Sequence, residues 1–175
     1  MDKKMTIWQG DITKLKADAI VNAANKSLLG GGGVDGAIHR AAGPELLEAT
    51  RKLGGTETGE AKLTKGFKIP AKYVIHTVGP VYNDGESGED VYLTKCYENA
   101  LKLADENNLE SIAFSAISTG VYGYPTIEAT EIAIKTVNRI LPELEFVEEV
   151  IFVVYDDLMK DVYEETFTRL NIQRS

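Results

Sequence analysis

The sequence predicts one α/β domain spanning residues 1–175, and three observations support this. Apolar runs of β-forming residues alternate with amphipathic helical patterns along almost the whole chain. The length of 175 residues falls in the range of about 100–200 residues typical of one domain. The runs at 112–117 and 150–155 are almost entirely apolar, as are strands covered by helices on both faces.

Six strands are expected. In chain order they lie at about 5–8, 19–23, 61–64, 73–78, 112–117 and 150–155, the third being the weakest pattern. Each is a short run of strand-forming residues.

Helices are expected where apolar residues recur every three or four positions. Such stripes occupy 93–104, 133–141 and 159–170, and a further helical pattern follows the glycines at 30–33. Asn107 and Asn108 should end the first of these helices. Segment 82–89 reads as a long loop with solvated acidic residues, because Asn83-Asp84-Gly85 signals a turn.

Composition narrows the classes of partner. Nineteen basic against 27 acidic residues give a net charge of −8, which argues against long nucleic acids. The longest apolar runs are far below the ~20 residues that span a bilayer, so no membrane partner is expected. Cys96 is the only cysteine and lies on an apolar stripe, which predicts an inert buried thiol and a reducing, cytoplasmic location. Two histidines and one cysteine do not make a zinc site, so we expect no metal.

Four consecutive glycines, 30–33, lie between the second strand and a helical pattern. They permit positive φ and close ligand approach, and the following helix would direct free N–H groups at an anion. Gly31, Gly33 and Gly36 formally match the dinucleotide fingerprint, but residues 25–29 separate them from the strand and no acidic residue follows a second strand at the expected spacing. No Gly-Lys-Ser/Thr follows the glycines, which argues against a P-loop. The segment therefore predicts a phosphate cradle, with a flexible loop as the alternative.

A second glycine loop, 117–125, follows another predicted strand. Loops after neighbouring parallel strands face one crevice, so two phosphate-binding loops together suggest a pyrophosphate. Tyr122 and Tyr124 offer aromatic surface for a sugar or base, although either ring could instead pack on the loop.

Five segments in register resemble a macrodomain of the MacroD type. They are Gly10-Asp-Ile-Thr13, Val21-Asn-Ala-Ala-Asn25, residues 30–36 with Val34-Asp35, Ile75-His-Thr-Val-Gly-Pro80 and residues 117–125. The resemblance implies a three-layer α/β/α fold around a mixed, mostly parallel sheet, with ADP-ribose as ligand and no cofactor. It also implies hydrolysis of esters on the distal ribose, in O-acetyl-ADP-ribose or in proteins mono-ADP-ribosylated on Asp or Glu.

The same resemblance assigns binding roles. Asp11 would accept from the adenine amino group and the Ile12 backbone would contact the ring, with a turn or cap role for Asp11 as the less favoured alternative. Backbone N–H groups of Gly32, Gly33 and Val34 would hold the phosphates and distal ribose. The loop of Ser118, Thr119, Gly120, Val121 and Tyr122 would close over the pyrophosphate, with Tyr122 against the ribose.

Asn25 and Asp35 are the implied catalytic residues. Asn25 would orient a ribose hydroxyl, and Asp35 would orient or activate the attacking water. The alternatives are a turn former at Asn25 and an N-cap at Asp35. His39, four positions after Asp35, is expected to support it, whereas Asn22 and His76 are expected to be structural.

Two other functions compete with a hydrolase. A non-catalytic reader of ADP-ribose needs the phosphate loops but no carboxylate beside the distal ribose, so the pair of Asn25 and Asp35 favours an enzyme. A modulator of an RNA-processing partner gains no support from the acidic charge.

Overall fold

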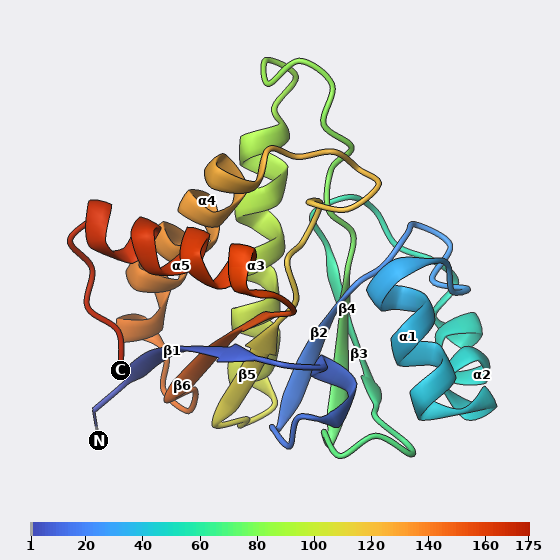
Figure 1. Ribbon diagram of the computed structural model, residues 1–175. Helices are drawn as coiled ribbons and strands as arrows, with labels where there is room; N and C mark the ends of the chain where they lie inside the picture. Colours follow the sequence, from blue (N-terminus) through green and yellow to red (C-terminus); the bar gives the residue numbers. More distant parts are fainter. Residues whose placement is uncertain (1) are drawn as a thin grey trace.

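The computed structural model describes residues 2–175 and places their strands in one six-stranded sheet with helices on both faces (Figure 1). The strands are β1 Lys4–Gln9, β2 Ala19–Ala23, β3 Ala61–Lys65, β4 Tyr73–Thr77, β5 Ser111–Phe114 and β6 Glu149–Val154. The helices are α1 Gly33–Ala42, α2 Pro44–Leu53, α3 Glu89–Glu106, α4 Thr126–Ile140 and α5 Asp157–Arg169, with short 3₁₀ turns η1 Ile12–Lys14 and η2 Leu141–Glu143.

The sheet has the order β1-β6-β5-β2-β4-β3. All neighbouring strands are parallel except the last pair, in which β3 runs antiparallel to β4 at the edge. The mixed, mostly parallel sheet expected from the sequence is thus confirmed. The weakest predicted strand, β3, is the antiparallel edge strand.

The core lies on both faces of the sheet, because alternate residues of a strand point to opposite sides. On β2, Ile20 packs in the apolar cluster that includes Ile38 of α1 and Leu46 of α2. Its neighbour Val21 packs in the larger cluster formed with α3, α4 and α5. Figure 1 shows the same division, with α1 and α2 on one face and the other three helices opposite. This confirms the three-layer α/β/α architecture.

Helix α2 is the element that the periodicity analysis did not predict. It begins one residue after α1 ends, with Pro44 in its first turn and Gly54 after its end in the left-handed region, at φ 73°. Proline at the start and glycine past the end are typical helix boundaries. These two residues were the available signals.

Strand β5 is shorter than the apolar run 112–117 suggested. Pairing with β2 ends at Phe114, opposite Val21. Beyond it the Ser115 hydroxyl donates to the Val21 carbonyl at 2.8 Å, so a side chain takes over where the backbone ladder stops. Residues 115–117 therefore already belong to the loop that reaches the candidate site.

The expectation that all acidic residues of segment 82–89 are solvated is wrong for Glu89. Its carboxylate is buried and accepts hydrogen bonds from the backbone N–H groups of Asn83, Asp84, Gly85 and Ser87 at 2.7–3.1 Å. These bonds, led by the one from Asn83, lower the pKa of Glu89 to about 2. The carboxylate thus fixes the shape of the loop.

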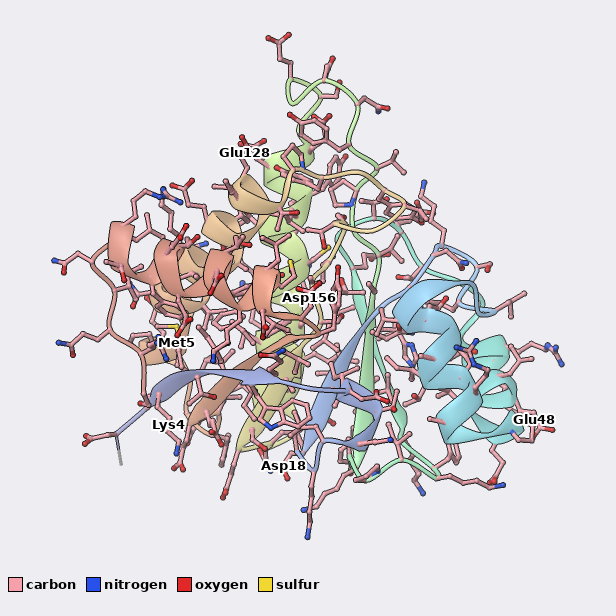
Figure 2. All side chains as sticks on the ribbon, in the orientation of Figure 1. Lys4, Met5, Asp18, Glu48, Glu128 and Asp156 are labelled. Atoms are coloured by element: carbon pink, nitrogen blue, oxygen red, sulfur yellow. The ribbon has the colours of Figure 1, made fainter. Side chains whose placement is uncertain are left out.

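Charged side chains lie on the outside of the layers. Glu48 of α2 and Glu128 of α4 are exposed and point away from the sheet on different sides of the molecule (Figure 2). Asp156 caps α5, since its side chain accepts from the N–H of Met159 at 2.9 Å. Within residues 2–175, no helix combines the length and apolar character needed to cross a membrane.

Candidate active site

A cavity of about 940 Å³ opens at the carboxyl ends of the parallel strands, where α/β sheets bind ligands. Its size lies in the range of small-molecule sites. The wall contains every residue that the sequence analysis assigned to ligand binding or catalysis: Asp11, Ile12, Asn25, Gly32, Gly33, Val34, Asp35, Ser118, Thr119, Gly120, Val121 and Tyr122. The two glycine loops therefore meet in one site, as expected, while the role of each residue stays a prediction.

The first glycine loop has the backbone geometry that the glycines predict. Gly30 and Gly33 adopt positive φ, 93° and 57°. Helix α1 begins at Gly33 with Gly32 as its N-cap, so no side chain caps its first N–H groups. A Cβ on Gly32 or Gly33 would meet nothing within 4 Å, so the backbone is open on the cavity side. This is a helix N-terminus that can bind an anion.

Two other glycines are required by close packing. A Cβ on Gly36 would lie 2.5 Å from the carbonyl oxygen of Gly31, so α1 approaches the loop too closely for any side chain there. A Cβ on Gly31 would lie 3.1 Å from Asp35 Oδ2 and 3.3 Å from Asn25 Nδ2. The loop thus rests on the two predicted catalytic side chains.

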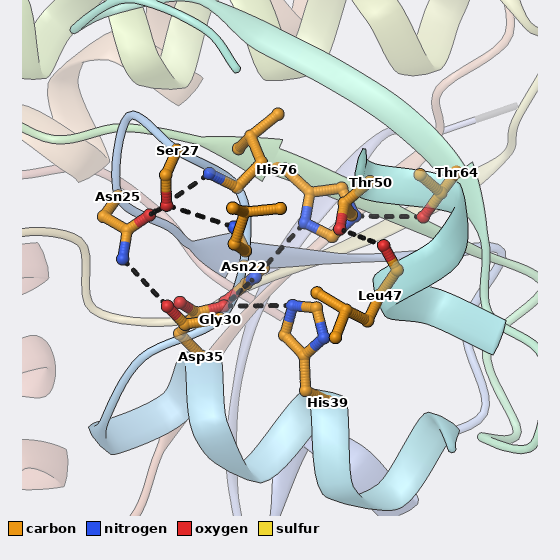
Figure 3. A network of polar contacts seen from close by, with 12 residues as sticks. Asn22, Asn25, Ser27, Gly30, Asp35, His39, Leu47, Thr50, Thr64 and His76 are labelled. Carbon is orange, nitrogen blue, oxygen red and sulfur yellow. Dashed lines mark hydrogen bonds and ion pairs between the residues drawn. The ribbon is translucent and has the colours of Figure 1, made fainter. Parts of the chain in front are cut away.

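Asp35 is buried in the cavity wall and is held by its neighbours. It is the third residue of α1, not its N-cap, so the alternative capping role is wrong. Its Oδ1 accepts a hydrogen bond from Asn22 Nδ2 at 2.8 Å and lies 3.5 Å from His39 Nε2. Figure 3 shows these three side chains pointing toward one another. The contacts fix the carboxylate through Oδ1 and leave Oδ2 on the side of Gly31.

The amide of Asn22 is fixed in turn by His76. The two residues are register partners on β2 and β4, and Asn22 Nδ2 lies 3.2 Å from His76 Nδ1. Since the same amide nitrogen also donates to Asp35, Nδ1 must accept, and Nε2–H then donates to the Thr64 hydroxyl at 2.9 Å. Burial lowers the pKa of His76 to about 3, so the ring is neutral. The structural role expected for Asn22 and His76 is therefore one of orienting Asp35.

Burial of His76 predicts acid sensitivity. In the unfolded chain the imidazole has a pKa near 6.5, so between about pH 6.5 and pH 3 the unfolded state binds the extra proton. The contribution of His76 to the free energy of unfolding is complete above pH 6.5 and is lost as the pH falls below it. Between pH 7 and pH 5 the free energy of unfolding should fall by about 2 kcal/mol. Urea unfolding at both pH values measures this. The variant His39→Gln should show the same fall in the free energy of unfolding between the two pH values. If the fall disappears in that variant, the effect belongs to His39 and not to His76.

Asn25 has the turn-forming role considered for it, while its catalytic role stays a prediction. Its Oδ1 accepts from the N–H of Leu28 at 3.2 Å and from the Ser27 hydroxyl at 2.7 Å, and its Nδ2 donates to the Gly30 carbonyl at 2.9 Å. The side chain is therefore a turn former that fixes the start of the glycine loop. It also lines the cavity beside Asp35.

Asp11 likewise has a capping role. Its Oδ1 accepts from the backbone N–H and the hydroxyl of Thr13, at 2.9 and 2.7 Å, and so caps η1. The Thr13 hydroxyl is the main cause of a lowered pKa at Asp11. The exposed side chain lies at the cavity wall with Ile12. Capping and an adenine contact are compatible, because the cap uses Oδ1.

The second loop is built around Ser118, which has a positive φ of 68°. Its buried hydroxyl donates to the Pro80 carbonyl at 2.9 Å, so this side chain shapes the loop. Tyr122 lines the cavity, and its carbonyl accepts from the N–H of Tyr82 at 2.8 Å. Tyr124 is buried with its ring 4.8 Å from that of Tyr82, so the packing alternative is correct for Tyr124.

Tyr155 was not singled out from the sequence. It lines the cavity directly after β6 and is 74% exposed. The available signal was its position as the last residue of a predicted strand, at the edge of the sheet where the ligand loops gather. It adds aromatic surface to the site.

Two further expectations concern the Cys96 thiol and the binding of a metal ion. Cys96 is fully buried and its Sγ contacts the Val78 carbonyl at 3.2 Å, and burial raises the pKa of the thiol to about 11. The expected burial of the Cys96 thiol is thus confirmed. Among residues 2–175, no three His, Cys, Asp or Glu side chains are grouped to hold a metal ion.

Comparisons with known proteins agree with this arrangement. A family model described as Macro domain matches residues 21–133. The chain is 52% identical over 173 residues to an O-acetyl-ADP-ribose deacetylase of Escherichia coli strain K12, covering 97% of this chain and 98% of that protein. It resembles the Oceanobacillus iheyensis macrodomain with ADP, at TM-score 0.93 and 45% identity over 97% and 93% of the two chains. It also resembles a Trypanosoma brucei macrodomain in complex with ADP-ribose, at TM-score 0.87 and 46% identity over 93% and 68% of the chains.

Proposed function

The chain belongs to the Macro domain family, and we propose that it binds ADP-ribose and hydrolyses esters on the distal ribose. The substrates are O-acetyl-ADP-ribose and proteins mono-ADP-ribosylated on Asp or Glu. The similar deacetylase and the two similar macrodomains that hold ADP and ADP-ribose support the ligand and the reaction class. The observation that carries the proposal is the buried Asp35 carboxylate, held by Asn22 in the wall of a cavity formed by two glycine loops.

The site fits this ligand group by group. The open N-terminus of α1 and the second glycine loop offer backbone donors to the two phosphates. Asp11 and Ile12 lie in the same wall for the adenine, and Tyr122 offers its ring to the distal ribose. Because backbone groups hold the phosphates, an acidic protein can bind a dianion without a cluster of Lys or Arg.

In the proposed reaction, water attacks the acyl carbon of the ester and Asp35 accepts a proton from it. The bond between the acyl carbon and the ribose oxygen then breaks. The ribose oxygen takes the proton back from Asp35, so the products are ADP-ribose and the free carboxylic acid, which ionises. Asn22 keeps Oδ1 occupied, so Oδ2 is the oxygen that faces the water.

A non-catalytic reader is less consistent with this wall. Reading ADP-ribose requires the phosphate loops, whereas Asp35 places a buried negative charge beside an anionic ligand. That charge weakens binding, and the structure still holds it in place with Asn22 and His39. A role in the chemical step accounts for it.

The direct test uses both substrates. Purified protein is incubated with O-acetyl-ADP-ribose and, separately, with a glutamate-automodified ADP-ribosyltransferase, and mass spectrometry follows the release of ADP-ribose. We expect turnover of both, retained in excess EDTA because no group of ligands for a metal was found among residues 2–175. Binding of ADP-ribose without release from either substrate would make the protein a reader.

Asp11→Ala should raise KM while leaving kcat nearly constant. Adenine lies far from the breaking bond in the proposed complex, so its contact is equally strong in the ground state and the transition state. Steady-state kinetics on O-acetyl-ADP-ribose measures both constants. Thermal melting is the control, because the loss of the cap on η1 costs about 0.5–2 kcal/mol. A large fall in kcat at saturating substrate would show that adenine binding positions the ribose.

A further inference from the structure

A second cavity of about 630 Å³ adjoins the candidate active site. The two cavities share Gly79 and Tyr122, so the Tyr122 residue stands between them. The other residues in its wall include Lys26, Glu57, Val81, Glu89 and Tyr92. None of these was assigned to ligand binding above.

The second cavity lies at the reacting end of the site. Tyr122 is the residue assigned to the distal ribose, and Lys26 directly follows Asn25, the other residue assigned there. In an ester substrate the acyl group extends away from that ribose. An acetyl group ends after two carbons, whereas a modified Asp or Glu continues into a polypeptide that must leave past Tyr122.

We propose that the second cavity binds the polypeptide segment that carries the ADP-ribosylated carboxyl group. This inference rests on the proposed function and extends it from the nucleotide to the acceptor. The cavity then increases affinity for modified proteins without contributing to the binding of ADP-ribose itself.

The charges of the lining favour a peptide over another phosphate-bearing unit of an ADP-ribose chain. Lys26 is the one cation of the wall and forms an ion pair with Glu57, with Nζ and Oε2 3.7 Å apart. Glu89 adds a second carboxylate. The lining therefore carries a net charge of −1, and four backbone N–H groups of the loop in its wall are already bound to Glu89, so the wall lacks the free backbone donors that a pyrophosphate would need there.

The apolar part of the wall is exposed and suits side chains of a peptide. Val81 is 53% exposed in the loop that links β4 to α3, and Tyr92 is 42% exposed in the first turn of α3. An exposed tyrosine is typical of the anchoring residues of protein interfaces. Asn83, Ser87 and Thr58 add hydrogen-bonding groups around them.

The loop that forms one wall of the second cavity is held in shape by hydrogen bonds within the protein. Glu89 accepts four backbone N–H groups of the loop that forms one wall, as described above. The hydrogen bond from Tyr82 N–H to the Tyr122 carbonyl ties that loop to the second glycine loop. Peptide binding therefore requires little further ordering of this loop, so the entropic cost on the side of the protein is small.

The test compares the affinities of two probes by calorimetry: free ADP-ribose and a short peptide with one mono-ADP-ribosylated glutamate. Asp35→Asn serves as the background to prevent turnover. Tyr92→Ala removes part of the wall, and Val81→Trp fills the cavity. Val91→Ala is the control for Tyr92→Ala, and Leu158→Trp is the control for Val81→Trp. Val91 on α3 and Leu158 on α5 are both exposed and lie outside both cavities.

We expect the modified peptide to bind about tenfold tighter than ADP-ribose, and both cavity variants to remove that advantage while ADP-ribose affinity is unchanged. The controls should retain it. Equal affinity of the two probes, or an equal loss for both in the cavity variants, overturns the inference. So does an ADP-ribose dimer that gains the same advantage as the peptide. Turnover of O-acetyl-ADP-ribose by the unaltered protein is measured in parallel, so failure of the proposed function shows separately.

Discussion

Asp35→Ala should lower kcat for O-acetyl-ADP-ribose by about 10²–10⁴, the usual contribution of a positioned base. Binding of ADP-ribose should survive, because in the proposed complex backbone N–H groups of the glycine loops hold the phosphates, and the substitution leaves these groups in place. Loss of a buried negative charge near the pyrophosphate should even tighten binding slightly. Single-turnover hydrolysis and titration with ADP-ribose on one sample measure the two effects.

The matched variant is Asp35→Asn. Alanine leaves one of the two N–H groups of the buried Asn22 amide without its acceptor, which costs about 1–3 kcal/mol of stability. Asparagine keeps an oxygen for Asn22 but removes the base, so it should lose the same activity with a smaller change in melting temperature. A folded variant of either kind with undiminished hydrolysis would remove Asp35 from the mechanism and leave the ligand's own phosphate as the group that activates water.

Gly36→Ala should lower kcat/KM by about 10²-fold, although Gly36 lies in a helix. The new methyl group would lie 2.5 Å from the Gly31 carbonyl, so the glycine loop must move. Because Gly31 packs against Asp35 and Asn25, that movement misplaces phosphate donors and catalytic groups together, and a displacement of about 1 Å suffices for a loss of this size.

Thermal melting separates this effect from misfolding. Alanine is favoured over glycine in a helix by about 1 kcal/mol, so the helix itself is not weakened. The opposite control is Ala41→Gly on the exposed side of α1, which should lower the melting temperature and keep the activity. Full activity of Gly36→Ala would show that the loop tolerates the displacement and that its position does not limit catalysis.

Much of the fold could be predicted because its strands are buried on both faces. The runs around Val21, Phe114 and Phe152 are nearly continuous in apolar residues, which indicates strands covered on both faces. Helix α2 was not predicted because its apolar face is short and only Pro44 and Gly54 mark its ends. The end of β5 depended on a single hydroxyl, that of Ser115, which no periodicity records.

The candidate site divides in the same way. The glycine loops were predictable, since bare backbone in sequence leads directly to positive φ and open N–H groups in space. The orientation of Asp35 was not, because it depends on a chain of contacts through Asn22, His76 and Thr64 from three different strands. Likewise, a buried Glu89 looks in sequence like one more solvated acid, because its partners are backbone groups that every residue has.

The position of β1 at the edge of the sheet has a consequence for the order of events during synthesis. Its only neighbour in the sheet is β6, in a register that pairs Lys4 with Glu149, and Ser175 N–H donates to the Met5 carbonyl. Figure 1 shows both ends of the chain at this edge. Strands β2 to β5 emerge from the ribosome before β6 and can pair among themselves, whereas β1, which precedes them in the chain, waits without a partner until residues 149–154 emerge. Strand β1 therefore docks only after β6 has been made, and a nascent chain that stalls before β6 exposes it to chaperones and to other chains.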